Sequence, residues 1–226
     1  MMTKKIDSIT VGGFQTNCWL YPLDEIPDQG GKQPCVVIDP GDEAELIISR
    51  IQKLNWIPRF ILLTHGHFDH IAALPDLLEY FGKGITNSGS SATAPPKIGI
   101  HRMDAHYLGK DALTVHSESF AYIDKFWKPM PEADILFEEG ATAGPFKILH
   151  VPGHTQGSIA LYDEKAVVLF SGDTLFKRGR GRTDLPGGDE QQIYQSLKRL
   201  SSMNGDIVVC PGHGPATTIG EEAGYY

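Results

Sequence analysis

The apolar residues of this chain fall into short runs that turn residues separate. Runs rich in β-branched and aromatic residues predict strands over 16–21, 35–38, 59–64, 146–151, 158–162, 166–172 and 206–210. Two stretches, 42–54 and 189–203, instead repeat their apolar residues at helical spacing and begin with acidic residues, so each predicts a helix. Strand, helix and strand in succession over 35–64 predict a βαβ unit.

The stretch 82–135 is the least regular part of the chain. Gly, Ser and Pro gather at its start, and short helical stretches follow. We therefore expect a single domain over residues 1–226, with 82–135 as a loop and helix insertion within it. The aromatic residues of this insertion are candidates for a lid that faces the substrate, namely Tyr107, Tyr122, Phe126 and Trp127.

Two of the predicted strands end alike. CVVIDPGD before residue 43 and AVVLFSGD before residue 174 are both apolar runs that end in Gly-Asp. This similarity indicates two alike halves, as in a fold made of two packed sheets with outer helices.

Polar residues with metal-binding side chains follow four of the predicted strands. His65, His67, Asp69 and His70 lie within HGHFDH, directly after the run RFILLT. The other three come after separate strands, in PGHTQGS (His154), SGDTLF (Asp173) and PGHG (His213). Since strand ends meet at one edge of a sheet, we expect these seven side chains to converge.

Five imidazoles and two carboxylates exceed the roughly four ligands of one zinc-type ion, but they suit two ions about 3.5–4 Å apart. His65 and His67 are two residues apart and can point to the same side of an extended segment. Asp69 and His70 follow as the chain turns into a helix, so they address a neighbouring position. We assign one ion to His65, His67 and His154 and the other to Asp69, His70 and His213, with Asp173 as the bridge.

Composition narrows the function further. The formal net charge is -8 with His neutral, which argues against nucleic acid or an anionic membrane as a partner. The three cysteines are widely spaced in apolar runs and form no CxxC, so we interpret them as buried packing residues. We expect neither a signal peptide nor a transmembrane segment, and therefore a cytoplasmic location.

HGHFDH, PGHTQGS, SGDTLF and PGHG together resemble the signature of the metallo-β-lactamase superfamily over about 8–220. The resemblance implies an α/β fold, an αββα sandwich with a dinuclear site at one edge of its sheets. GDTLFKRGRGRTDLPGGD and VVCPGHGPATTIGEE are similar to glyoxalase II, the hydroxyacylglutathione hydrolases, in its short single-domain form. That group hydrolyses S-D-lactoylglutathione, a thioester.

The resemblance to glyoxalase II is less complete at the residues that contact the substrate. Arg182 matches the basic residue that contacts glutathione in full-length glyoxalase II, but Asp184 stands where a Tyr is expected. Arg180 and Arg182 belong to the one dense basic cluster of the sequence, 177–182. They are our candidates for binding the carboxylates of an anionic acyl-thioester, and a solvated loop is the alternative interpretation.

The expected mechanism uses a metal-bridging hydroxide as the nucleophile, with Asp69 and Asp173 as the catalytic carboxylates. Two divalent ions are the expected cofactors, with zinc ahead of iron or manganese. Persulfide dioxygenases share the GRTD element and THxHxDH but use a single iron, which makes them the first alternative. Hydrolysis of another ester or a lactone is a second alternative, and a non-catalytic metal site is a third. The oligomeric state stays open.

Overall fold

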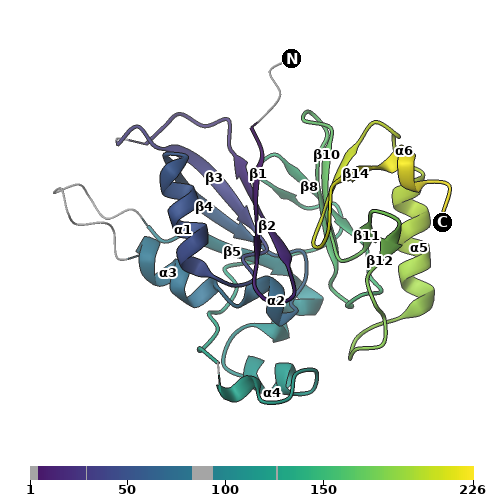
Figure 1. Cartoon of the computed structure of the whole chain (residues 1–226), viewed down its shortest axis with the longest axis horizontal. Helices are drawn as coiled ribbons and strands as arrows, with labels where there is room; N and C mark the ends of the chain where they lie inside the picture. The colour runs from purple at the N-terminus through teal and green to yellow at the C-terminus, as the bar shows by residue number, and fades with distance from the viewer. Residues whose placement is uncertain (1–4, 29, 83–93, 126) are drawn as a thin grey trace.

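Two six-stranded sheets pack face to face, and helices cover their outer surfaces (Figure 1). The structure is a computed structural model, and it describes residues 5–28, 30–82, 94–125 and 127–226. The layer order, helix, sheet, sheet and helix, confirms the αββα sandwich that the resemblance implied.

The first sheet has the order β1-β2-β3-β4-β5-β6. Its strands are β1 (Asp7–Val11), β2 (Thr16–Pro22), β3 (Gln33–Ile38), β4 (Trp56–Leu62), β5 (Lys97–His101) and β6 (Ile135–Phe137). The first three strands pair antiparallel, whereas β3, β4, β5 and β6 run parallel. The carboxyl ends of the parallel strands therefore share one edge.

The second sheet has the order β14-β13-β10-β9-β8-β7. Its strands are β7 (Thr142–Ala143), β8 (Phe146–His150), β9 (Ile159–Asp163), β10 (Val168–Gly172), β13 (Val208–Pro211) and β14 (Thr217–Thr218). Because β8 and β10 both pair antiparallel with β9, and β13 pairs parallel with β10, these three strands point the same way. A two-stranded ribbon of β11 (Leu175–Phe176) and β12 (Gly179–Arg180) follows β10.

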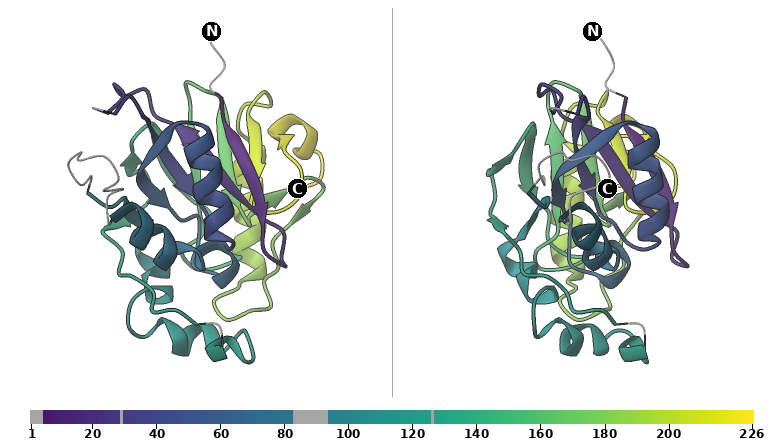
Figure 2. Two further views of the ribbon diagram at one scale, coloured as in Figure 1. Left: turned by 60° about the vertical axis from the view of Figure 1, so that its left-hand side comes forward. Right: turned by 90° about the vertical axis from the view of Figure 1, so that its left-hand side faces the viewer.

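The helices lie outside the sheets and across their shared edge. They are α1 (Ala44–Lys53), α2 (Phe68–Ile71), α3 (Leu74–Gly82), α4 (Ala112–Ser117), α5 (Glu190–Ser201) and α6 (Ile219–Glu222), with the 3₁₀ helices η2 (Arg102–Tyr107) and η3 (Ile123–Lys125). Figures 1 and 2 show α1 and α3 on the outside of the first sheet, α5 outside the second, and α4 beyond the lower ends of both sheets. No helix among the described residues is long and apolar enough to cross a membrane.

Successive side chains of a strand point to opposite faces of the sheet. Because both faces of each sheet are buried, the strand sequences are continuous apolar runs. In β3, Val36 and Ile38 pack between the sheets, while Cys35 and Val37 face α1 and α3. In β10, Phe170 packs between the sheets and Leu169 faces α5. All three cysteines are buried, as the sequence predicted.

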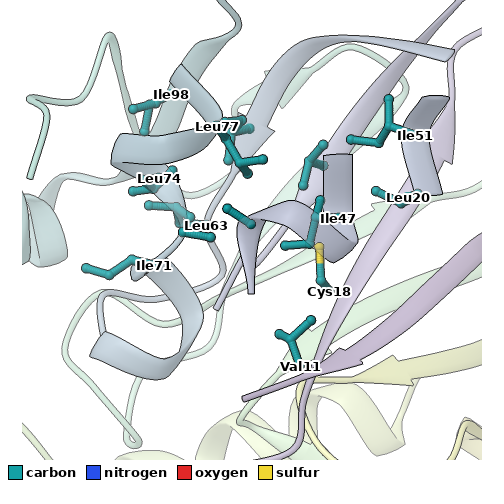
Figure 3. Packing of buried hydrophobic residues seen from close by; sticks show 14 of the residues in the cluster. Val11, Cys18, Leu20, Ile47, Ile51, Leu63, Ile71, Leu74, Leu77 and Ile98 are labelled. Carbon is teal, nitrogen blue, oxygen red and sulfur yellow. The ribbon is translucent and has the colours of Figure 1, made fainter. Parts of the chain in front are cut away.

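Helix α1 packs on the first sheet through one apolar face. Ile47 and Ile51 of α1 are fully buried against the sheet residues Cys18 and Leu20 (Figure 3). Each buried aliphatic side chain of this kind contributes about 1.5–3 kcal/mol by leaving water. This burial fixes the βαβ unit that positions the end of β4.

The prediction of an insertion over 82–135 is wrong in its extent, because β5 is an inner strand of the first sheet. Its sequence KIGIH hides the strand, since Gly99 at its centre has low β-propensity. A Cβ on Gly99 would lie 2.5 Å from the Phe137 ring, so packing requires glycine there. Residues 83–93 of the predicted insertion and Phe126 lie outside the described residues.

Candidate metal centre

Three imidazoles from two sheets form the first group of ligand-type side chains. His65 and His67 follow β4, and His154 follows β8; all three are buried. Their ring nitrogens lie within 4.8 Å of one another, and His67 Nδ1 is 2.8 Å from His154 Nε2. The structure therefore brings together the trio that the sequence assigned to one ion.

Asp69, His70 and His213 form the second group. His70 Nε2 lies 3.3 Å from His213 Nε2 and 3.6 Å from Asp69 Oδ2, and the latter oxygen is 3.4 Å from His213 Nε2. Asp69 and His70 lie in α2, so the turn into this short helix aims them at a position beside the first group. This is the second predicted trio.

Asp173 lies between the two groups, directly after β10. Its Oδ2 is 3.6 Å from Nε2 of His154 in the first group and 3.4 Å from Nε2 of His213 in the second. Its Oδ1 is 3.4 Å from Nε2 of His70. One carboxylate thus reaches nitrogens of both trios, which is the position expected of a bridging ligand.

Three of these imidazoles use their other ring nitrogen to bond an oxygen outside the site. The pairs are His154 Nδ1 with the Arg182 carbonyl (2.7 Å), His213 Nδ1 with the Phe14 carbonyl (3.1 Å) and His70 Nδ1 with Asp39 Oδ2 (3.0 Å). Because each ring donates outward through Nδ1, its Nε2 is the nitrogen that faces the centre. Metal-binding histidines are oriented in this way in proteins.

Asp39 contacts one of the ligand-type residues and was missed by the sequence prediction. It directly follows β3, has a φ of 52° in the left-handed region, and is buried. Besides His70, it accepts hydrogen bonds from the backbone N–H of Thr64 (2.8 Å) and from the Thr64 hydroxyl (2.6 Å). It therefore holds the start of the His65–His70 loop. The signal in the sequence was an Asp placed directly after the apolar run CVVI.

The donor set fits divalent metal ions. Nε2 of His65 and Nε2 of His67 are buried and have no hydrogen-bond partner among the described residues, and nitrogens of neighbouring imidazoles converge. A buried polar atom without a partner costs free energy that coordination to a cation removes. Imidazole and carboxylate together are ligands for zinc, iron and manganese.

Protonation states in the first group favour coordination. Burial, with the neighbouring imidazoles, lowers the pKa of His65 well below its usual value. Burial and His154 lower the pKa of His67 to about 3. Both rings are therefore neutral at pH 7, and the neutral imidazole is the form that binds metal.

In the second group, carboxylates and imidazoles hold each other charged. Burial alone would lower the pKa of His213, but hydrogen bonds to Asp173 and Asp69 raise it to about 10. Burial likewise opposes ionisation of Asp69, yet His70 and His213 lower the pKa of that carboxyl to about 2. The ionised carboxylates provide the negative charge that two cations would neutralise.

Glycines next to the ligands allow this close approach. A Cβ on Gly212 would lie 2.2 Å from Asp173 Oδ1, and one on Gly172 would lie 2.3 Å from Thr64 Oγ1. Gly172 also has a φ of 50°, which disfavours other residues. The packing of the centre therefore requires glycine at positions 172 and 212.

The sequence model of a protein family, the Metallo-beta-lactamase superfamily, matches residues 11–213. This match covers most of the chain and includes all seven ligand-type residues. The chain belongs to the metallo-beta-lactamase superfamily. Hydroxyacylglutathione hydrolase GloC of Haemophilus influenzae is 36% identical over 226 residues, which cover 96% of this chain and 94% of the relative.

Solved structures of this superfamily agree with the fold. The crystal structure of TTHA1623 in a di-iron-bound form has a TM-score of 0.77 and 36% identity, and covers 96% of each chain. BLEG-1, described as a B3 metallo-beta-lactamase, has a TM-score of 0.78 and 33% identity, and covers 97% of each chain. The resemblance inferred from the sequence is thereby confirmed at the level of the superfamily.

The two arginines predicted to bind substrate form ion pairs with carboxylates of this chain. Arg180 pairs with Glu190 and lies over the Tyr194 ring, 4.9 Å from its centroid. Arg182 makes a two-bond ion pair with Asp184, with both distances 2.7 Å, and both side chains are exposed. Substrate binding by either arginine stays a prediction.

Two aromatic residues of the predicted lid pack beside the centre, and a third is exposed. The Tyr107 ring lies 5.7 Å from the His67 ring and is buried. The Trp127 ring stacks on Phe68 at 6.0 Å. Tyr122 is 70% exposed, with the Lys125 ammonium over its ring. Tyr107 and Trp127 therefore help to build the wall around the first group and α2.

Proposed function

We propose that this protein is a metal-dependent thioester hydrolase of the hydroxyacylglutathione type, with two divalent ions and zinc as the expected metal. The observation that carries the proposal is the position of Asp173, whose one carboxylate reaches nitrogens of both trios. Pairs of ions that share a ligand are suited to hydrolysis. The 36% identity with GloC supports a thioester as the substrate.

The chain's residues would divide the work of hydrolysis between them. Two divalent ions, when bound, lower the pKa of water to about 7, supply hydroxide at neutral pH and polarise the substrate carbonyl. The Thr16 hydroxyl donates to Asp69 Oδ2 at 3.0 Å and so orients this carboxylate, which would accept a hydrogen bond from the hydroxide. A thiolate leaves readily because its thiol has a pKa of about 8.5, so no further acid is needed.

Substrate assays beside metal analysis test the proposal. The purified full-length protein is expected to contain about two ions per chain and to hydrolyse S-D-lactoylglutathione. Oxygen uptake with glutathione persulfide, or cleavage of a β-lactam or a lactone, is measured in parallel. A chain with a single iron that consumes oxygen with the persulfide would contradict the proposal, as would two bound ions without thioester hydrolysis.

Separate replacement of His67 and His70 tests the division of the ligands. His67→Ala is expected to remove the ion of the first group, and His70→Ala the ion of the second, so each variant retains about one ion per chain. His106→Ala, which removes an exposed imidazole outside both groups, serves as the control and retains two. Loss of both ions from each variant would show that the two positions do not fill independently.

A further inference from the structure

Asp104 is a buried carboxylate outside the ligand set, and it contacts two of the ligand loops. It belongs to η2, and its side chain is inaccessible to solvent. Its Oδ2 accepts a hydrogen bond from the backbone N–H of Gly66 at 3.0 Å and from the Thr155 hydroxyl at 2.7 Å. Its Oδ1 accepts one from the backbone N–H of Gly157 at 2.6 Å.

These three donors belong to the segments that hold the first group. Gly66 lies between His65 and His67, and Thr155 directly follows His154. The bonds of Asp104 span 38 residues to the first loop and 51 to 53 residues to the second. One carboxylate thus joins the loop after β4 in one sheet to the loop after β8 in the other.

The donors match an ionised carboxylate. Two are backbone N–H groups, and the third is a hydroxyl whose oxygen lies 2.8 Å from Ser158 Oγ. Burial raises the pKa of Asp104, while the bonds from Thr155, Gly157 and Gly66 oppose that rise. Hydrogen bonds to a charged acceptor are stronger than neutral ones, so this side chain restrains both loops.

Glycines adapt both loops to η2. A Cβ on Gly157 would lie 2.5 Å from Asp104 Oδ1, and one on Gly66 would lie 2.2 Å from Cδ2 of Tyr107, the last residue of η2. Both loops therefore approach η2 more closely than other residues would permit. The contact is specific to these two backbone segments.

We infer that Asp104 is a positioning residue that sets the spacing of His65, His67 and His154 and thereby the metal affinity of the first group. It acts through the two backbone loops and touches no ligand-type residue of the second group among the contacts described above. The inference rests on the metal-binding part of the proposed function and does not depend on the substrate.

Zinc titration of the full-length chain tests this role. Asp104→Ala and Asp104→Asn are each combined with His213→Ala, which leaves only the first group complete, and with His67→Ala, which leaves only the second. Competition with a chromophoric chelator measures the zinc affinity of each. Asp104→Ala is expected to weaken zinc binding about 10–100-fold in the first background and to leave the second within about threefold.

The Asn variant keeps one acceptor oxygen, so we expect a smaller loss at the same position. It also decides the question if the Ala variant does not unfold cooperatively in a thermal melt. Glu222→Gln is the matched control, because Glu222 is equally buried and accepts from the Arg178 N–H (2.8 Å) and the Thr217 hydroxyl (2.7 Å). It is expected to bind zinc like the parent in both backgrounds.

Two results would overturn the inference. Equal weakening in both backgrounds would mean that Asp104 only supports the fold, and unchanged affinity in the first background would mean that it has no role there. Absence of zinc binding by the wild-type chain would instead overturn the metal-binding proposal itself. Two-site binding by the wild type with unaffected Asp104 variants would overturn only the positioning role.

Discussion

Replacement of Asp39 by Asn is expected to weaken metal binding at the second group. Asp39 accepts three hydrogen bonds, from the Thr64 N–H at 2.8 Å, the Thr64 hydroxyl at 2.6 Å and His70 Nδ1 at 3.0 Å. An amide has one acceptor oxygen, so its NH₂ group must face either the Thr64 N–H or the His70 N–H. In the first orientation the Thr64 N–H, at the start of the His65–His70 loop, loses its acceptor. In the second orientation His70 loses the partner that orients its Nε2.

The size of the effect follows from the lost bond. A hydrogen bond to a charged acceptor contributes about 1.5–3 kcal/mol. Since about 1.4 kcal/mol corresponds to a tenfold change in an equilibrium constant, the loss corresponds to about 10–100-fold in affinity, if it falls wholly on the bound state. Loss of the charge of Asp39 acts in the same direction, because the carboxylate favours a cation nearby.

Chelator competition in the His67→Ala background, where only the second group is complete, measures this change. Asp134→Asn is the control, because Asp134 accepts the Ile98 N–H at 2.8 Å in the same sheet, and none of its hydrogen bonds joins it to a ligand-type residue. An Asp39→Asn affinity within about threefold of the parent would refute the reasoning, as would an equal loss from the control.

Three further predictions concern the surroundings of the centre. Arg182→Ala is expected to raise KM for an anionic thioester more than it lowers kcat, whereas Asp184→Asn frees the guanidinium and should lower KM; steady-state kinetics in which neither KM changes would exclude an anion site there. Burial and His150 lower the pKa of His101 to about 4, below its usual value, so protonation favours the unfolded chain and stability falls as the pH drops from about 6.5 towards 4. His101→Gln should flatten this part of the stability curve by at most about 3 kcal/mol, less solvent screening, in urea unfolding at several pH values; a parallel pair of curves would contradict it. Gly66→Ala places a Cβ 2.2 Å from the Tyr107 ring and should cost about 1–3 kcal/mol in thermal unfolding, and an unchanged Tm would show that the ring moves freely.

The sequence predicted where strands end better than it predicted which strands pair with one another. The stretches before His65, His154, Asp173 and His213 are continuous apolar runs, and Gly beside a polar residue marks where each run stops. Convergence followed because strands that point the same way bring their ends to one edge. The two trios and the intermediate position of Asp173 could therefore be predicted from local pattern and ligand count.

What escaped prediction depends on contacts between distant residues. Asp104 lies in a short 3₁₀ helix without a periodic signal, and its partners are 38 to 53 residues away. The role of β5 depends on its pairing with β4 and β6, which its sequence does not reveal. The pairing of Arg182 with Asp184 is local, two residues apart, but a motif does not show which side chain an arginine contacts.

Ions bound at the candidate centre would each cross-link the two halves of the chain. The nitrogens of His67 and His154 that face each other are 87 residues apart in sequence, and those of His70 and His213 are 143 apart. A covalent tie across a loop of about 90 residues would lower the entropy of the unfolded chain by the equivalent of about 4–5 kcal/mol at 25 °C. Ions at this edge would thus stabilise the folded chain by holding the two halves together. Removal of the ions would weaken the contact between the two sheets at the edge where the ligand-type residues lie. Metal binding would therefore be coupled to the docking of one half on the other.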